Sequence, residues 1–185
     1  MDSKLTQFHG VEGRDQITFS ILLYYEWKNK FLHWRPSMNG GITKMTIPVD
    51  RVCRPEMVLY ESLLDDFDSK HQAGVELYND GTCYWYPVVK YVAGCSLDMT
   101  FYPYDTQYCP LKFGSWTFTS AEVNLGVRTP TNNVTGVGQT GLMFDDPMKP
   151  NSTEWEILST DGMLNFVEYP CCIDLYAGEF LLHQK

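Results

Sequence analysis

Short segments in which apolar and polar residues alternate recur along the chain, and they are rich in β-branched and aromatic side chains. A period of two is typical of half-buried strands, because successive side chains of a strand point to opposite faces of its sheet. The chain shows no convincing amphipathic helix, internal repeat or low-complexity linker. The pattern predicts strands over residues 16–25, 41–49, 83–91, 96–102 and 164–169.

Clusters of turn-forming residues separate these predicted strands. Asn79-Asp80-Gly81 lies between two apolar runs and predicts a hairpin. Residues 35–41 and 159–162 predict further turns, and the stretch 129–150, rich in Pro, Gly, Asn and Thr, predicts a long surface loop. Together these features predict one all-β domain over residues 1–185, built as an immunoglobulin-like β-sandwich.

The charge of the chain narrows the partners that we expect. With a formal net charge of -9, it has no basic face to neutralise phosphates, so nucleic acid is not expected to bind. An acidic surface attracts cations instead. No run of about eighteen apolar residues is present, and no stretch that resembles a signal peptide follows the first residues. We therefore expect the chain as given to be soluble.

The cysteines and histidines carry no metal or enzyme signature. None of the six cysteines lies in a Cys-x-x-Cys array with histidines at zinc spacing, so neither a metal nor another cofactor is expected. The four histidines have no spaced nucleophile or carboxylate, so catalysis is not expected either. Sequons at Asn133 and Asn151 predict glycosylation and passage through an oxidising secretory compartment.

The most specific motif begins at Cys95 and ends at Cys109, with thirteen residues between the two cysteines. It contains Phe101-Tyr102-Pro103-Tyr104-Asp105 and is followed by Gly114-Ser115-Trp116. This pattern resembles the signature of the Cys-loop receptors, and the resemblance implies a Cys95–Cys109 disulfide and the ligand-binding-domain fold of that family. A disulfide that only restricts the unfolded chain would stabilise a loop of this size by about 3 kcal/mol.

The adjacent Cys171 and Cys172 form a second unusual feature. A disulfide between neighbouring residues strains the backbone, and such strain persists where a binding loop needs a stiff tip; two free or separately paired cysteines are the alternative. Tyr169 and Tyr176 flank the pair, and the segment resembles loop C of acetylcholine-binding subunits. That resemblance implies a Cys171–Cys172 disulfide and two tyrosines that close over a ligand.

The resemblance also implies an aromatic box on one side of a subunit interface, the principal side. Its members would be Tyr60, Trp116, Tyr169 and Tyr176, and the π-faces of such rings attract a quaternary ammonium. The implied ligand is a small cation such as acetylcholine or nicotine. Glu56 matches an acid that braces the tryptophan loop, with a solvated loop acid as the alternative. Lys112 matches a basic residue that changes partners as loop C closes, although Ala177-Gly178 stands where the family has an acid.

The other side of the interface, the complementary side, departs most from the family. Leu22 stands where the family has a tryptophan, which removes one wall of the box. Tyr84 and Tyr86 could offset this loss, and Asp145 and Asp146 could line a further loop. The two remaining cysteines, Cys53 and Cys83, are either free thiols or form an additional disulfide.

Two roles remain open for a member of this family. One is a soluble, secreted acetylcholine-binding protein, which the absence of a membrane segment favours slightly; the other is the extracellular domain of a nicotinic-type channel subunit. Either role implies a homopentamer outside the cell, secreted or on the outer side of the plasma membrane. Contact with a membrane would require a full-length receptor. An immunoglobulin-like adhesion module is a remote alternative, because it would show a long Cys-to-Cys spacing with a tryptophan between.

Overall fold

The computed structural model describes residues 2–12, 15–64, 73–123, 125, 155–168 and 173–184. These residues form ten β-strands and two short 3-10 helices, η1 (Pro36–Met38) and η2 (Val49–Arg51). The strands are β1 (Asp2–Glu12), β2 (Gln16–Lys28), β3 (Lys44–Ile47), β4 (Val58–Leu59), β5 (Val75–Tyr78), β6 (Thr82–Trp85), β7 (Val88–Gly94), β8 (Thr106–Gly114), β9 (Trp155–Glu168) and β10 (Ile173–Gln184).

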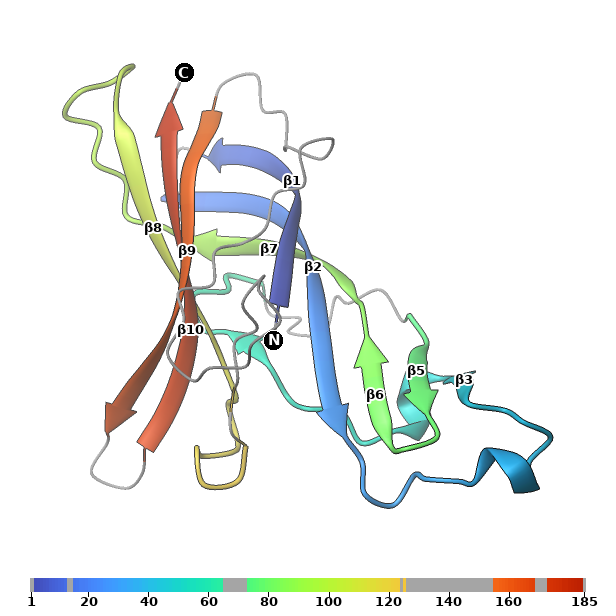
Figure 1. The fold of residues 1–185 in the computed structure, drawn as a ribbon. Helices are drawn as coiled ribbons and strands as arrows, with labels where there is room; N and C mark the ends of the chain where they lie inside the picture. The colour runs from blue at the N-terminus through green and yellow to red at the C-terminus, as the bar shows by residue number, and fades with distance from the viewer. Residues whose placement is uncertain are drawn as a thin grey trace.

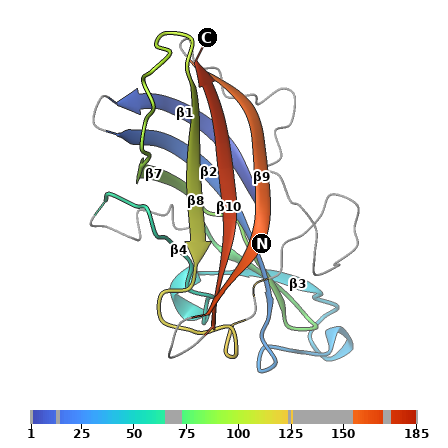
Figure 2. The same ribbon diagram turned by 90° about the vertical axis from the view of Figure 1, so that its left-hand side faces the viewer.

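The strands form two antiparallel sheets (Figure 1). The six-stranded sheet has the order β1-β2-β6-β5-β3, with β7 also paired to β2, and the four-stranded sheet has the order β4-β8-β10-β9. Figure 2 shows β8, β10 and β9 in front of β1, β2 and β7. The predicted all-β, two-sheet architecture is therefore confirmed. In the part of the chain that the structure describes, no helix has the length and apolar character needed to cross a membrane.

Strand β2 shows how the sequence pattern produces the core. Its side chains alternate between buried and partly exposed from Ile21 to Tyr25, so the odd positions point between the sheets. They pack there with side chains such as Trp85 of β6 and Leu111 of β8. The Trp85 indole also donates a hydrogen bond to the carbonyl of Ala73 at 2.9 Å, so its one polar group stays satisfied inside the core.

Most of the predicted strands are confirmed. Residues 16–25 lie within β2, residues 41–49 contain β3, and residues 164–168 form the end of β9. The segment 83–91 is split into β6 and β7, both antiparallel to β2. The interruption falls at Tyr86-Pro87, because proline has no N–H to donate to a strand ladder; its carbonyl still accepts the N–H of Leu23 at 3.0 Å. The hairpin at residues 79–81 is confirmed between β5 and β6.

The strand predicted over residues 96–102 is wrong. Backbone groups in this segment form hydrogen bonds with side chains and not with a neighbouring strand. The amide side chain of Gln107 accepts a hydrogen bond from the N–H of Asp98 and donates one to its carbonyl, both at 2.8 Å. Asp98 then accepts the N–H of Thr100 at 3.0 Å, which turns the chain locally. The alternating pattern of this segment therefore belongs to a folded loop.

The turn predicted over residues 159–162 is also wrong, because these residues lie inside β9. The register against β10 passes from Ala177 opposite Leu164 to Glu179 opposite Asp161, so β9 carries one residue more than its partner at this point. Such an extra residue is a β-bulge, and Gly162 lies within it. The Asp-Gly pair that resembles a turn signal thus marks a bulge in a continuous strand.

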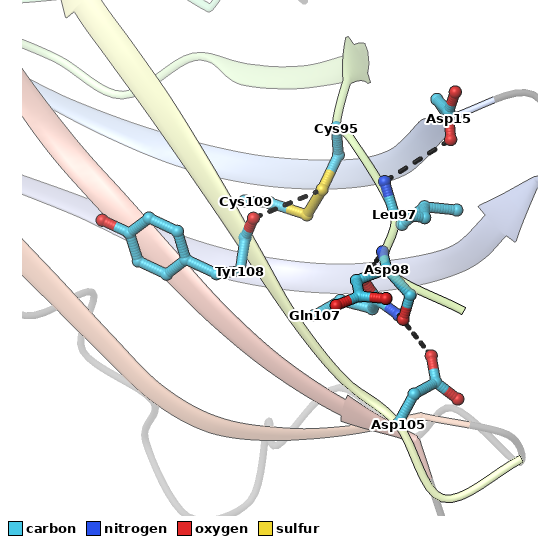
Figure 3. Close-up of a disulfide and its surroundings, with 8 residues drawn as sticks. All are labelled: Asp15, Cys95, Leu97, Asp98, Asp105, Gln107, Tyr108 and Cys109. Atoms are coloured by element: carbon cyan, nitrogen blue, oxygen red, sulfur yellow. Dashed lines mark hydrogen bonds between the residues drawn. A yellow bond between two sulfur atoms is a disulfide. The ribbon is translucent and has the colours of Figure 1, made fainter. Parts of the chain in front are cut away.

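A disulfide joins Cys95, directly after β7, to Cys109 in β8 (Figure 3). It connects the six-stranded sheet to the four-stranded sheet, and the predicted pairing is confirmed. Beside it, the Gln107 amide also donates to the buried carboxylate of Asp105. Cys53 and Cys83 are free thiols, exposed and buried respectively, so the structure shows no additional disulfide between them.

Candidate functional site

Two aromatic rings meet where strands β4 and β8 end. Tyr60 directly follows β4, and Trp116 lies two residues beyond β8. Their ring centroids are 5.8 Å apart, with the planes inclined by 42°. The antiparallel register brings the two segments side by side, with Val58 of β4 opposite Gly114 of β8, and the Tyr60 hydroxyl reaches the carbonyl of Ser115, the residue before Trp116. The Trp116 side chain is 69% exposed, so it presents a large aromatic surface that a ligand can cover.

Hydrogen bonds hold this ring pair in place. The carboxylate of Glu56 accepts the N–H of Thr117 at 3.0 Å and its hydroxyl at 3.2 Å, on the residue that follows Trp116. The Ser115 hydroxyl reaches the same carboxylate at 3.5 Å, and the Tyr60 hydroxyl donates to the Ser115 carbonyl at 2.7 Å. The bracing role that the resemblance implied for Glu56 is confirmed by these contacts.

Strand β10 reaches the same end of the four-stranded sheet along the other edge of β8. Ala177 of β10 pairs with Phe113 of β8, so the backbone of Tyr176 lies beside the residue after Phe113. Figures 1 and 2 both show β10 beginning close to the segment that follows β8. Three elements that carry predicted ligand contacts, at Tyr60, Trp116 and Tyr176, therefore converge on one end of the sheet.

Several predicted features lie outside the described residues. They include the hairpin tip between β9 and β10 and the stretch before β9. The structure therefore leaves untested the Cys171–Cys172 disulfide, both glycosylation sites and part of the predicted ligand contacts. The residues concerned are Tyr169, Cys171, Cys172, Asp145, Asp146, Asn133 and Asn151. Their roles stay predictions.

Lys112 of β8 forms an ion pair with Glu61, the residue that follows Tyr60 of the ring pair. Its ammonium lies 3.6 Å from the carboxylate of Glu61, which also accepts the Lys112 N–H at 2.7 Å. The carbonyl of Lys112 accepts the N–H of Tyr60 at 3.0 Å, so the lysine and Tyr60 are held in one hydrogen-bonded unit. A change of partner by Lys112 on ligand binding stays a prediction, and Glu61 is the partner that it would leave.

The predicted complementary residues Leu22, Tyr84 and Tyr86 belong to the other sheet. Leu22 lies on β2 opposite Val88 of β7, at an even position that points away from the core. Tyr84 lies on β6 opposite Glu26 of β2 and is likewise only partly buried. The structure thus brings these three residues to the outer face of the six-stranded sheet and does not place them beside Trp116 of the same chain.

Two further tyrosines, which the sequence argument missed, complete a ring cluster on this face. The Tyr24 and Tyr86 centroids are 5.3 Å apart, those of Tyr84 and Tyr86 are 6.4 Å apart, and those of Tyr78 and Tyr84 are 5.5 Å apart. We call these four residues the tyrosine face. Two sequence signals could have placed Tyr24 and Tyr78 beside Tyr84 and Tyr86. They are the alternation of side chains along β2 and the hairpin between β5 and β6.

Burial and a nearby carboxylate both affect the phenol of Tyr86 on the tyrosine face. The pKa of Tyr86 is raised, first by burial and then by the carboxylate of Glu76 and the neighbouring tyrosines. A raised phenol pKa means that the neutral form is favoured, here mainly because burial penalises the charged form. Glu76 lies on β5 directly opposite Tyr84. The rings of this face can attract a cation through their quadrupoles, whereas the Glu76 carboxylate is already paired with the ammonium of Lys44 at 2.9 Å.

Both aromatic groups can thus attract a cation, but they lie on different sheets of one chain. Among the described residues, no group of three or more His, Cys, Asp or Glu side chains could hold a metal ion. The chemistry that the described residues offer is reversible recognition of a cation by rings and carboxylates.

The sequence of this chain is similar to a known family and to curated proteins. Residues 1–182 match the family described as the neurotransmitter-gated ion-channel ligand binding domain. Among curated relatives, neuronal acetylcholine receptor subunit alpha-2 of Homo sapiens is 31% identical over 173 residues, which cover 93% of this chain and 30% of the relative. Subunit alpha-4 of Mustela putorius furo is 33% identical and subunit alpha-6 of Mus musculus is 32% identical, with 93% of this chain covering 26% and 33% of those relatives.

The chain therefore spans a third or less of the length of these receptor subunits. The family is one of ligand-binding domains, so the expectation that this chain is not an enzyme is confirmed. Because the family matches nearly all of the chain, and its disulfide loop and two-sheet fold are present, this protein belongs to the neurotransmitter-gated ion-channel ligand-binding domain family.

Proposed function

We propose that this domain binds a small cationic ligand of the acetylcholine or nicotine type through an aromatic box. The observation that carries the proposal is the ring pair of Tyr60 and Trp116, 5.8 Å apart and with Trp116 largely exposed. An ammonium against a desolvated aromatic ring gains about 2 kcal/mol or more. Hydrogen bonds to Glu56 hold the loop of Trp116 in advance, which lowers the entropic cost of binding.

The ligand site is completed between two copies of the chain. The ring pair lies on the four-stranded sheet, whereas Leu22, Tyr84 and Tyr86 lie on the outer face of the other sheet. One face of each subunit would then meet the opposite face of the next, and such a heterologous interface repeats until a ring closes. We propose a homopentamer, which light scattering on the glycosylated protein at high concentration would test. A monodisperse monomer or dimer under those conditions would contradict it.

A Trp116→Ala variant tests the binding proposal directly. Titration calorimetry with acetylcholine or nicotine should show loss of binding, because the largest exposed π-face of the box is removed. Phe31→Ala is the matched control, since Phe31 is a 93% exposed aromatic residue between β2 and η1 and belongs to neither aromatic group. It should bind as the parent protein does. If Trp116→Ala binds these ligands as tightly as the parent, the aromatic box is wrong and the likeness to the family concerns the fold alone.

A second observation concerns the role of the whole protein. The loop closed by Cys95 and Cys109 exposes a row of apolar and aromatic side chains to solvent, which are Met99, Phe101, Tyr102 and Tyr104. Phe101 is 73% exposed, which is unfavourable for a surface that stays in water. This loop favours the extracellular domain of a nicotinic-type channel subunit, in which it would face the membrane domain, over a soluble binding protein.

The transcript beyond Lys185 distinguishes these two roles. Four apolar spans, each long enough to cross a bilayer, would support the channel subunit. A stop codon soon after Lys185 would support the secreted binding protein. The ligand site proposed above is the same in both cases.

A further inference from the structure

The segment that joins β2 to β3 exposes several large apolar side chains. We call residues 29–43, which include η1, the β2–β3 loop. Within it, Phe31 is 93% exposed, Met38 is 76% exposed and Ile42 is 50% exposed. Single exposed apolar residues are ordinary on a protein surface, but three of them in one loop are a concentration that marks interaction sites.

Hydrogen bonds hold this loop against the hairpin between β5 and β6. The N–H of Asn29 donates to the carbonyl of Gly81 at 2.9 Å, and the N–H of Trp34 donates to the carbonyl of Asn79 at 3.1 Å. The Trp34 indole also donates to the carbonyl of Ile42 at 2.6 Å, which joins the two arms of the loop. Gly81 has a φ of +87°, and a Cβ there would collide with the Asn29 carbonyl, so the close approach requires glycine. A loop that is already ordered loses little conformational entropy when a partner binds.

The charge of the β2–β3 loop is opposite to that of the chain. The chain has 23 acidic and 14 basic residues, whereas the loop contains Lys30 and Arg35 and no Asp or Glu. Both side chains are exposed, and no acidic side chain of the described residues forms an ion pair with either of them. The flanking Lys28 and Lys44 do pair with carboxylates of the β5–β6 hairpin. The positive charge of the loop itself is therefore available to an anionic partner.

The β2–β3 loop lies far from the loop that the disulfide closes. Figures 1 and 2 both show η1 and its surroundings at one end of the domain, and the end of β10 with the segment between β7 and β8 at the other. A partner bound to the β2–β3 loop would therefore leave the Cys95–Cys109 loop accessible.

The mixture of side chains distinguishes between anionic partners. Phenylalanine, methionine and arginine are all enriched in protein–protein interfaces. A sulfated glycan would pair with Lys30 and Arg35 but has few apolar groups to cover Met38. An anionic bilayer would be repelled by the half-exposed carboxylate of Asp80, in the hairpin to which the loop is bonded. A protein with acidic and apolar side chains fits both features.

We propose that the β2–β3 loop is a docking surface for an acidic protein segment. An apolar side chain of the partner packs on Phe31 and Met38, and its carboxylates pair with Lys30 and Arg35. Complementary charge speeds the encounter and fixes the orientation, and burial of the apolar side chains supplies most of the affinity. The surface lies outside both aromatic groups, so the inference does not depend on the ligand site proposed above.

The test is a selection from a library of displayed random peptides on the assembled protein. Peptides that also bind a variant carrying both Phe31→Ser and Arg35→Gln are removed. We expect the remaining peptides to be rich in Asp and Glu and to contain a large apolar residue. In calorimetry with one such peptide, Phe31→Ala should weaken binding about tenfold or more, because a buried ring is lost. Arg35→Gln should weaken it about threefold and reduce its dependence on salt.

Leu158→Ala and Lys90→Gln are the matched controls. Leu158 is a 53% exposed apolar residue on β9, and Lys90 is an exposed lysine on β7, so both variants should bind the peptide as the parent does. Chemical denaturation should show that all four single variants are as stable as the parent, since the substituted side chains are exposed.

Three outcomes would overturn the inference. The first is that no peptide remains after the removal step, or that the remaining peptides are not acidic. The second is that Phe31→Ala binds the selected peptide as tightly as the parent does. The third is that heparin, or vesicles containing phosphatidylserine, bind this loop more tightly than every selected peptide, because the occupant would then be a glycan or a bilayer.

Discussion

The ring pair and the tyrosine face both present aromatic rings but are built in different ways. Tyr60 and Trp116 lie in irregular segments after β4 and β8, and hydrogen bonds to Glu56 and Ser115 hold those segments. The rings of the tyrosine face instead project from β2, β5 and the β6 region at alternate strand positions. In the first case side-chain hydrogen bonds position the rings, and in the second case the register of the sheet does so.

This difference has consequences for how each group responds to change. A loop held by one carboxylate loses its geometry when that carboxylate is altered, whereas a row of rings on paired strands keeps its positions when one polar neighbour changes. The ring pair should therefore be sensitive to Glu56. The tyrosine face should be tuned mainly by charge, through Glu76 and Lys44.

The largest expected effect comes from breaking the connection between the two sheets. Cys95→Ala combined with Cys109→Ala removes the disulfide, and we expect the free energy of unfolding to fall by about 3 kcal/mol, since the unfolded chain regains the freedom of the closed loop. Chemical denaturation measures this loss. Cys53→Ala is the control, because Cys53 is a free and exposed thiol and its loss should leave stability nearly unchanged. Equal stability of the double variant and the parent would contradict this prediction.

The next effect separates the loop-built group from the strand-built one. Glu56→Gln keeps the shape of the side chain but weakens its hydrogen bonds to Thr117, and we expect acetylcholine binding to weaken about tenfold. Glu122→Gln is the control in the same segment, where Glu122 accepts the N–H of Thr119 at 3.2 Å. Calorimetry should find it close to the parent. A similar loss in both variants would mean that Glu56 has no special part in holding the ring pair.

A smaller effect concerns the missing wall of the complementary side. Leu22→Trp places an indole on the outer face of β2, on the same side as Tyr24, and should strengthen binding of single cations several-fold to about tenfold. Leu22→Met keeps the side chain apolar without a ring and should change little. If both substitutions change the affinity for acetylcholine equally, the gain is not a ring effect and Leu22 does not line the site.

The smallest effect is a titration. The folded-state pKa of Tyr86 is raised, mainly by burial and next by Glu76, so the unfolded state releases this proton first as pH rises. The contribution of Tyr86 to stability is complete below about pH 10 and is lost above it. Ultraviolet absorbance should show that Tyr86→Phe removes a phenol that titrates late, and that Glu76→Gln shifts this phenol toward its ordinary pKa. A late component that persists in Tyr86→Phe would belong to another tyrosine.

The sequence predicted some elements well and others poorly, for reasons that particular residues show. The alternation along β2 and the Asn-Asp-Gly turn are local signals, and both were confirmed. The Asp161-Gly162 pair carries a similar turn signal but lies in a bulge of β9, because pairing with β10 outweighs the local preference. Residues 96–102 alternate as a strand does but form a loop, because the Gln107 side chain takes the backbone groups that a neighbouring strand would need.

The amino-acid sequence by itself determined the all-β class, the cysteine loop with its disulfide, and the identity of Tyr60 and Trp116 as candidate ligand contacts. The all-β class follows from residue type and from alternation over short distances, whereas the disulfide and the two ligand contacts are what the resemblance of the motifs to the Cys-loop family implied. Only the tertiary structure decided that Glu56 holds the Trp116 loop, sixty residues distant in the chain, and that Tyr24 and Tyr78 join Tyr84 and Tyr86 in one row that ends at Lys44. Such contacts depend on which strands pair and in what register, and pairing between distant segments is settled by burial of the whole core.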